Sequence, residues 1–400
     1  MCCSIRCLIC LASTMILSLI FGFCLAEGAW EFERGDLQYY ESYSKQIYDA
    51  NETDYKHEIV WTIMHDEKDQ QELHLLKCMS LESGQVMEWT IENEYIIQKD
   101  PDEYDGVLYA VEDDEQVQIW LMQPDGRREQ LASYTITYPY WCHGPQTVRA
   151  YMHGTLYYIK SLEKVSPKEA DVSWHAAVLC SIDAKGNEYI YHLNNNADPV
   201  DAVFHYFAIS PHGKVAWVTA SEANRYRYFA RSIMLEIPGQ DVKSVLPEGI
   251  EGQMGWDTDT SYQSGGIYGQ SLCWIDDDHL MFGSFGITDG YRLPHLYILQ
   301  PDCEEVRPLS SVDNEPIKMY HSIQGASCVY YNREENLIAY LGSPNAQIEW
   351  DLRNDEAAVP HIIDLNTGKN YVLYQIKATS IDEGEFRNQT GQLSWMKTGT

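Results

Sequence analysis

Histidines near predicted strand ends are the residues in this chain best suited to metal or acid–base chemistry. None of them belongs to a His-x-x-x-His pair of the kind that places two ligands on one helix face. Imidazoles on separate strands can still converge in space, but a histidine hydrogen-bonded to a neighbouring backbone group is the commoner case. We therefore expect no metal and no other cofactor. The histidines concerned are His143, His153, His175, His205 and His321.

Two acidic segments carry the oxygen ligands that a cation prefers. Residues 100–106, DPDEYDG, resemble a calcium loop in composition, but the third aspartate comes one residue later than in the D-x-D-x-D-G pattern. Asp276, Asp277 and Asp278 directly follow an apolar stretch, and three adjacent carboxylates favour contact with water. We expect both segments to be plain solvated turns.

The nucleophilic side chains lack the sequence surroundings that activate them. Ser284 stands in Gly283-Ser284-Phe285-Gly286, which lacks the first glycine of the G-x-S-x-G elbow of serine hydrolases. Six cysteines follow the apolar N-terminus without a C-x-x-C pair, which argues against zinc. Their even number permits disulfides in an oxidising compartment, yet we favour mostly free, buried thiols. They are Cys78, Cys142, Cys180, Cys273, Cys303 and Cys328.

Aromatic and charged side chains gather in the long connections between predicted strands. Tryptophan and tyrosine offer large faces with a polar edge, which suit sugars or peptides, and beside carboxylates they also suit a cation. The alternative is that these aromatics fill gaps between sheets. The predicted binding residues are Tyr140, Trp141, Tyr226, Arg227, Trp256, Asp257, Asp259, Tyr262, Tyr291, Arg292, Tyr320, His321, Trp350 and Arg353.

Strands separated by tight turns must carry these loops. Residues 204–238 alternate as a strand, a tight turn at Ser210-Pro211-His212-Gly213-Lys214, a second strand, a polar loop and a third strand. Degenerate copies of this unit recur. The six expected groups of strands lie at 57–90, 106–134, 147–193, 204–246, 270–309 and 327–375.

Four antiparallel strands per group predict the blades of an all-β propeller. The first group has three strands, and the isolated strand signal at Leu393–Lys397 has the character of its missing inner strand. We therefore predict a six-bladed β-propeller closed by a C-terminal strand; five or seven blades would follow if one unit is misassigned. In such blades the first-to-second and third-to-fourth turns share one face, and the long loops share the other.

The turn of the fourth group carries a family resemblance. Ser210-Pro211-His212-Gly213-Lys214 followed by Val215-Ala216-Trp217 resembles the repeat of TolB-like, or WD40-like, propellers. Such repeats also form the propeller domain of the dipeptidyl peptidase IV family. The resemblance implies the fold more than a function, because residues 57–400 match by architecture and one group matches by motif. The chain lacks the sequence of the hydrolase domain that those peptidases add.

The N-terminal segment predicts that the chain lies outside the cytoplasm. Residues 8–25 are almost wholly apolar, and Cys24-Leu25-Ala26 offers a signal-peptidase site. A run of this length can also span a bilayer, so residues 1–26 are a signal peptide or a membrane anchor. A linker with a short amphipathic helix at Leu37, Tyr40, Tyr43 and Ile47 is expected over 27–56, and the propeller over 57–400. The formal charge of −32 argues against nucleic acid as partner.

These features favour an extracytoplasmic binding or scaffold module for a glycan, peptide or protein. The sequence carries no recognisable catalytic motif. The alternatives are a metal-dependent glycan-active enzyme, because extracellular propeller lyases resemble this fold and hold a metal with channel-mouth histidines, and a sensor ectodomain tethered by residues 8–25.

The leader generates the first testable prediction. Residues 1–26 should be absent from the mature exported protein, because the apolar stretch ends at a peptidase site. N-terminal sequencing of protein from its native host measures this. A chain that still begins at Met1 in the membrane fraction would instead support the tethered ectodomain.

Overall fold

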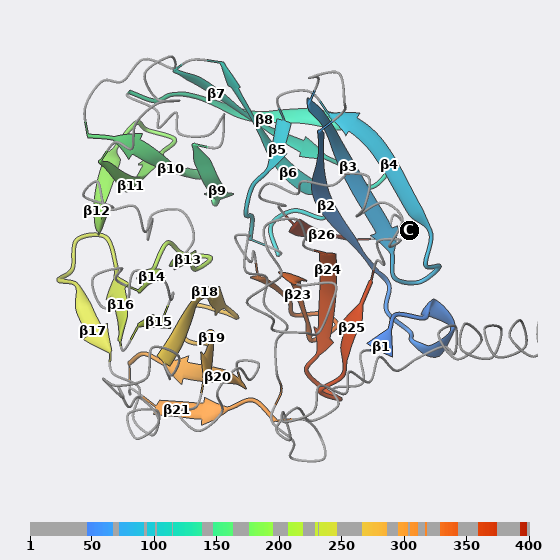
Figure 1. Ribbon diagram of the computed structural model, residues 1–400. Coiled ribbons are helices and arrows are strands. Elements are labelled where there is room, and N and C mark those ends of the chain that lie inside the picture. Colours follow the sequence, from blue (N-terminus) through green and yellow to red (C-terminus); the bar gives the residue numbers. More distant parts are fainter. Residues whose placement is uncertain are drawn as a thin grey trace, which may run out of the picture. The chain divides into compact units, whose positions relative to one another are not determined.

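The computed structural model describes most of the strands and part of their connections. The described residues are 46–66, 72–91, 94–100, 102–113, 115–137, 147–162, 176–194, 207–218, 229–230, 232–245, 266–285, 295–302, 305–310, 317, 329–342, 359–373 and 393–397. The chain divides into two units, Met1–Ile47 and Tyr48–Thr400. In the second unit these residues form six antiparallel sheets arranged around a ring (Figure 1).

The first three blades have four strands each, ordered from the inner strand to the outer one. Blade 1 consists of β26 (Leu393–Lys397), β2 (His57–Asp66), β3 (Glu72–Ser80) and β4 (Val86–Ile91). Blade 2 consists of β5 (Glu94–Ile96), β6 (Val107–Asp113), β7 (Gln116–Met122) and β8 (Arg128–Thr135). Blade 3 consists of β9 (Val148–Met152), β10 (Thr155–Ser161), β11 (Ala177–Asp183) and β12 (Glu188–Asn194).

The other three blades follow the same plan. Blade 4 consists of β13 (Phe207–Ile209), β14 (Val215–Trp217), β16 (Ile233–Glu236) and β17 (Lys243–Val245). Blade 5 consists of β18 (Gly266–Trp274), β19 (Leu280–Phe285), β20 (His295–Gln300) and β21 (Glu305–Pro308), with the short β15 (Phe229–Ala230) paired to β18. Blade 6 consists of β22 (Val329–Asn332), β23 (Leu337–Gly342), β24 (Val359–Asp364) and β25 (Asn370–Val372).

The predicted six-bladed, all-β architecture is confirmed, including its closure. Five residue pairs, from His57↔Lys397 to Trp61↔Leu393, join β2 to the C-terminal β26. Two short strands of blades 2 and 5 were not predicted: β5, the inner strand of blade 2, and β15, which pairs with β18 of blade 5. Both are too short to show an alternating pattern, so nothing in the local sequence distinguishes them from loop.

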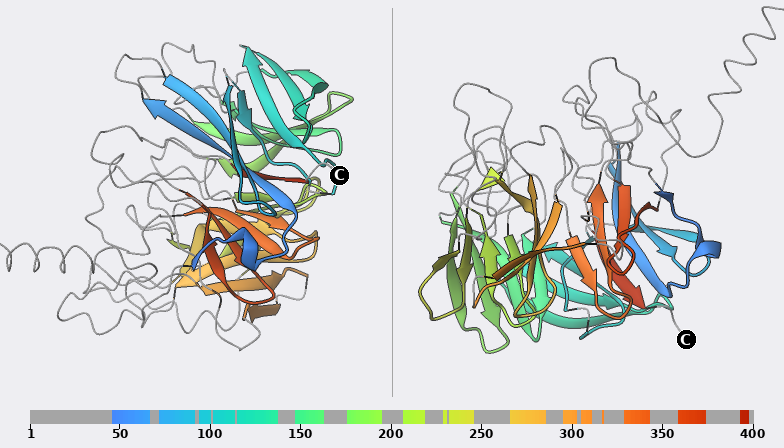
Figure 2. Two further views of the ribbon diagram at one scale, coloured as in Figure 1. Left: turned by 90° about the vertical axis from the view of Figure 1, so that its right-hand side faces the viewer. Right: turned by 90° about the horizontal axis from the view of Figure 1, so that it is seen from below.

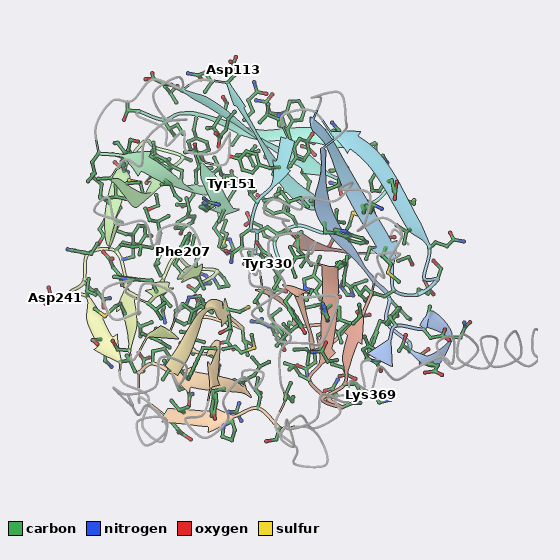
Figure 3. The ribbon with its side chains drawn as sticks, in the orientation of Figure 1. Asp113, Tyr151, Phe207, Asp241, Tyr330 and Lys369 are labelled. Carbon is green, nitrogen blue, oxygen red and sulfur yellow. The ribbon has the colours of Figure 1, made fainter. Side chains whose placement is uncertain are left out.

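The hydrophobic core lies between adjacent blades, because the face of each sheet packs on the face of the neighbouring sheet. Ile59 and Trp395 of blade 1 share a cluster with Leu337 of blade 6. The cluster between blades 2 and 3 includes Leu108 and Tyr158, both fully buried. Figure 3 shows side chains filling the spaces between the sheets, with Tyr151, Phe207 and Tyr330 toward the middle of the ring and Asp113, Asp241 and Lys369 at its rim.

Two tryptophans join neighbouring inner strands in the same way. The Trp274 indole Nε1 donates to the carbonyl oxygen of Ala208 in the preceding blade at 3.2 Å. The Trp395 indole Nε1 donates to the carbonyl oxygen of Tyr330 in blade 6 at 3.1 Å. The C-terminal strand therefore makes the same contact with the preceding blade as an ordinary inner strand does.

The geometry of the blade 4 turn explains why its sequence has serine at position 210 and glycine at position 213. The Ser210 hydroxyl accepts from the Lys214 N–H at 3.0 Å, and Gly213 takes a φ of 83°, which glycine adopts without a steric cost. A Cβ atom on Gly213 would come within 2.5 Å of the Tyr157 hydroxyl of blade 3. Glycine is thus required both by the turn and by the close approach of blade 3. The described turns gather on one side of the ring (Figure 2).

The start of the second unit lies earlier than the first predicted strand. Tyr48 is buried in the cluster of blades 1 and 6, and Tyr55 packs against that cluster. A 3₁₀ turn, η1 (Ala50–Glu52), lies between them. Of the residues expected to form a helix, Ile47 lies in the short β1 (Gln46–Ile47), whereas Leu37, Tyr40 and Tyr43 lie outside the described residues. No described helix has the length and apolarity needed to span a bilayer.

Removal of the C-terminal strand should open the ring. Truncation after residue 390 deletes β26 and its buried Leu393, Trp395 and Met396, so β2 and the inner side of blade 6 lose their partners. We expect aggregation and a lower melting temperature, measured by size-exclusion chromatography and calorimetry. Truncation after residue 397 is the matched control and should keep the native profile. A monomeric 1–390 chain with an unchanged melting temperature would contradict closure by β26.

Candidate functional site

The connections between the first and second strands of the six blades bring polar side chains together on one face of the ring, which we call the tight-turn face. Each blade contributes the connection between its first and second strands. These connections are residues 97–100 and 102–106 of blade 2, 153–154 of blade 3, 210–214 of blade 4, 275–279 of blade 5 and 333–336 of blade 6. Lys397 and His57 hold the same position in blade 1, where the two strands come from opposite ends of the chain.

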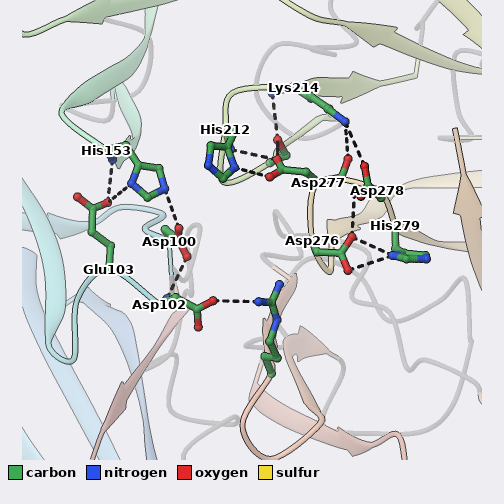
Figure 4. Close-up of polar contacts among 12 residues, drawn as sticks. Asp100, Asp102, Glu103, His153, His212, Lys214, Asp276, Asp277, Asp278 and His279 are labelled. Carbon is green, nitrogen blue, oxygen red and sulfur yellow. Dashed lines mark hydrogen bonds and ion pairs between the residues drawn. The ribbon is translucent and has the colours of Figure 1, made fainter. Parts of the chain in front are cut away.

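His153 joins blade 3 to blade 2. Its Nε2 lies 2.8 Å from Oδ2 of Asp100, and its backbone N–H donates to Oε2 of Glu103 at 2.7 Å (Figure 4). The residue adopts a φ of 49°, so the turn presents the imidazole toward blade 2 at the expense of a strained backbone. Only 8% of the Asp100 side chain is exposed. The expectation of a solvated acidic turn at residues 100–106 is therefore wrong for Asp100, which is buried against a histidine.

His212 continues the network from blade 3 to blade 5. Its ring stacks on that of His153 with centroids 5.2 Å apart and planes 22° apart. Asp277 accepts from the Ser210 hydroxyl at 2.7 Å and lies against Nδ1 of His212. Burial raises the pKa of Asp277, but the hydrogen bonds from Ser210 and His212 outweigh it, so the pKa lies below its usual value. Asp277 thus links two blades and is not the plain solvated turn residue that was expected.

The other two aspartates of this turn have different environments. Lys214 Nζ donates to the carbonyl oxygen of Asp277 at 2.7 Å and lies 3.6 Å from the Asp278 carboxylate, whose side chain is 69% exposed. Asp276 accepts from Nδ1 of His279 within its own turn. Solvation was therefore predicted correctly for Asp278.

Blades 6, 1 and 2 are joined by ion pairs. Lys397 Nζ lies 2.9 Å from Glu334 of blade 6 and 3.2 Å from Asp105 of blade 2. His57 of blade 1 lies 3.0 Å from the Glu335 carboxylate. The chain end and the first strand are therefore fastened on this face as well as by their backbone pairing.

A segment of blade 2, residues 97–100 and 102–105, crosses the ring axis at this face, and we call it the strap. The Gln98 N–H donates to the carbonyl oxygen of Arg149 at 2.9 Å, and the Tyr151 N–H donates to the carbonyl oxygen of Gln98 at 2.9 Å, both in blade 3. The Gln98 amide donates to the carbonyl oxygen of Ile209 in blade 4 at 3.0 Å. Asp102 pairs with Arg333 of blade 6 at 3.2 Å. Blades 4 and 6 are not neighbours of blade 2, so these contacts require the strap to lie over the centre.

Lys99 is the buried cation of the strap. The residue is 6% exposed, and its Nζ donates to the carbonyl oxygen of Tyr104 within the strap. Burial lowers its pKa to about 7, while the charges of Asp105 and Asp100 act in the opposite direction. The amine is therefore partly neutral near pH 7, which is unusual for lysine.

Glu112 is a buried carboxyl near the opposite end of β6, between blades 2 and 3. Its Oε1 accepts from the Val148 N–H at 3.0 Å and from the Tyr95 hydroxyl. Burial raises the pKa of Glu112 to about 7, although hydrogen bonds from Val148 and Thr147 lower it in part. A carboxyl and an amine with pKa values near 7 therefore lie at opposite ends of blade 2.

The described cysteines and histidines show no arrangement for nucleophilic or metal chemistry. Cys78, Cys180 and Cys273 are free and buried, as predicted. Burial raises the pKa of both Cys180 and Cys273 to about 12, which keeps these thiols protonated. Within the described ranges, no group of three or more histidine, cysteine or acidic side chains is placed to hold a metal ion. Cys142, Cys303, Cys328, His143, His175 and His205 lie outside those ranges.

The predicted binding residues are not among those that the structure describes. Tyr140, Trp141, Tyr226, Arg227, Trp256, Asp257, Asp259, Tyr262, Tyr291, Arg292, Tyr320, His321, Trp350 and Arg353 all lie outside the described ranges. Sequence reasoning missed the network that is described. The strap, Arg333 and the His153–His212 pair are far apart in the sequence, so no local spacing connects them.

The chain has weak similarity to several solved structures. No protein-family model matches the chain, and no curated protein sequence matches it. Among solved structures, TolB from Acinetobacter baumannii is 9% identical with a TM-score of 0.43, covering 80% of this chain and 63% of that one. The acylaminoacyl peptidase of Pyrococcus horikoshii is 12% identical with a TM-score of 0.41, covering 83% and 53%. The propeller domain of the Pyrococcus furiosus Trilobed protease is 10% identical with a TM-score of 0.39, covering 81% and 93%.

The two buried groups of blade 2 predict how stability depends on pH. Folded Glu112 keeps its proton up to about pH 7, whereas the unfolded chain releases it near 4.5, so stability should fall as pH rises between these values. Unfolded Lys99 keeps its proton to about 10.5 and folded Lys99 releases it near 7, so stability should rise over that interval.

Denaturant titrations from pH 4 to 10 measure both effects, and each should amount to roughly 1–3 kcal/mol. Glu112→Gln should remove the decrease below pH 7, and Lys99→Met should remove the increase above it. Glu129→Gln, at an exposed position on β8 of the same blade, controls for the loss of a carboxylate. An unaltered decrease below pH 7 in Glu112→Gln would refute the assignment to Glu112.

Proposed function

We propose that this chain is an extracytoplasmic binding propeller whose ligand meets the face opposite the tight-turn face. The main observation that supports this proposal is the position of the strap. Because it lies over the ring axis and is held by blades 3, 4 and 6, it obstructs access to the inner strands from its own side. A ligand that uses the centre of the ring then approaches from the other side.

The strand ends support the same choice of face. The chain leaves the described ends of β8 at Thr135, β14 at Trp217 and β23 at Gly342 on the side away from the tight turns. The sequence there continues into the long connections that contain the predicted aromatic residues. Long loops on a rigid scaffold are common sites of binding. In propellers these loops can come from every blade, so a ligand can contact several of them at once.

The ligand class follows from the chemistry of those connections. Tryptophan and tyrosine beside carboxylates favour a peptide, a protein segment or a glycan, and the acidic excess favours neutral or cationic ligands over anionic ones. The extracytoplasmic location rests on residues 1–26. A glycan-active metalloenzyme gains no specific support from the described side chains, so we propose binding without catalysis.

Ligand binding can be separated from packing by single substitutions. We first expect a thermal-shift screen of glycans and peptides to identify a ligand, which at a hundred times its Kd stabilises the fold by about 2.7 kcal/mol. Trp141→Ala, Trp256→Ala and Trp350→Ala should then weaken binding, measured by calorimetric titration, with nearly unchanged melting temperatures.

Trp217→Ala is the matched control for packing. Trp217 is 4% exposed in β14, so its removal should cost roughly 3–5 kcal/mol of stability. If the three loop variants lose as much stability as Trp217→Ala, their aromatics are packing residues and this face loses its main support as the binding site.

A further inference from the structure

Carboxyl groups bridge adjacent blades at several junctions, and two of them are contacted by donors on both oxygens. Glu236 of β16 is fully buried; its Oε1 accepts from the Tyr189 hydroxyl at 2.8 Å and its Oε2 from the His192 N–H at 2.9 Å, both in blade 3. Asp277 of blade 5 is likewise contacted on both oxygens by side chains of the blade 4 turn. Such contacts replace the water that a carboxylate loses on burial.

Glu112 bridges blades 2 and 3 in a different way. Its Oε1 accepts from the Val148 N–H of blade 3 at 3.0 Å and from the Tyr95 hydroxyl of its own blade. Its Oε2 is buried, and no residue in the described part of the chain forms a hydrogen bond with that oxygen. An ionised Glu112 would therefore leave a charged oxygen without water and without a donor, a cost that the neutral carboxyl group avoids.

The charged and titratable groups around Glu112 do not supply the missing donor. They are Tyr95 and Tyr134 on the same face of blade 2, Arg149 and Tyr158 of blade 3, and Asp113 and Glu115 on the hairpin of Glu112 itself. The charge of Arg149 favours the carboxylate, but burial outweighs it and raises the pKa of Glu112 to about 7. The geometry of the two oxygens and the direction of this shift therefore agree.

Release of the Glu112 carboxyl group to water leaves the backbone of the junction paired. Glu112 is the last residue but one of β6 and precedes the exposed Asp113, so its side chain lies close to the solvent. The Val148 N–H also lies 3.0 Å from the hydroxyl oxygen of Tyr95, which remains as an acceptor when Glu112 turns away. At the other end of the same junction, the hydrogen bond from the Tyr151 N–H to the Gln98 carbonyl oxygen is independent of Glu112.

From these contacts we infer that Glu112 is a proton-operated clasp between blades 2 and 3. With its proton bound, the carboxyl group stays in the junction and holds Val148. When the proton passes to water, the carboxylate turns toward the solvent, water takes its place, and Val148 is held by Tyr95 alone. The junction then loosens at the end away from the strap, while the strap keeps the two blades joined at the other end. The clasp does not depend on the identity of any ligand.

Amide hydrogen exchange at Val148, resolved by residue and corrected for the intrinsic rate at each pH, measures release of the clasp. In the unmodified protein we expect protection of this amide to fall by about tenfold or more between pH 5.5 and 8, because loss of the Glu112 proton favours the released form. Sub-denaturing urea should leave the exchange rate of Val148 unchanged at both pH values, since a local opening exposes little new surface, whereas exchange through unfolding of the whole chain accelerates in urea.

Two variants assign the effect to Glu112. Glu112→Gln keeps an oxygen acceptor for Val148 but cannot ionise, so protection should be the same at pH 5.5 and 8. Glu129→Gln removes an exposed carboxylate from β8 of the same blade and should keep the pH dependence of the unmodified protein. Protection of Val148 that does not change with pH, that falls equally in Glu112→Gln, or that falls on addition of urea would each overturn the clasp. The measurements in the unmodified protein decide between a local opening and none even if a variant folds poorly.

Discussion

The pairing of the two chain ends in one blade is the constraint on which this propeller depends. β26 and β2 are far apart in sequence, and each gives the other the hydrogen-bond partners that an edge strand lacks. The same five-residue strand reaches blade 6 through Trp395 and blade 2 through Lys397. Closure therefore joins three blades at once.

Polar contacts on the tight-turn face complement the apolar contacts between the sheets. The core clusters span neighbouring blades, while His153, Asp277, Lys397 and Arg333 connect the corners of those blades. A partly buried charge is tolerated where several donors reach it, as for Asp277, whose pKa is lowered by hydrogen bonds although partial burial raises it. Blade 2 departs from this pattern, because burial dominates at both Lys99 and Glu112 and moves each pKa toward neutrality.

The two faces of the ring consequently differ in character. One face has short turns tied together by hydrogen bonds, ion pairs and a strap across the axis, which makes it a firm base. The strand ends on the other face lead into long segments rich in tryptophan, tyrosine and acidic residues. This division between a frame of short turns and chemically varied connections supports the binding role that we propose.

The sequence by itself determined the blade plan: alternation and tight turns such as Ser210–Lys214 predicted six blades and the role of Leu393–Lys397, because these signals are local. It also predicted buried thiols at Cys78, Cys180 and Cys273. Tertiary structure decided the rest. The three residues of β5 are too few to show an alternating pattern. The acidic sequence around Asp100 predicts a solvent-exposed turn, whereas in the structure Asp100 is buried against His153 of another blade. Such contacts, for example Glu103–His153 and Asp102–Arg333, join residues 50 and 231 positions apart, and they form only when the blades are assembled.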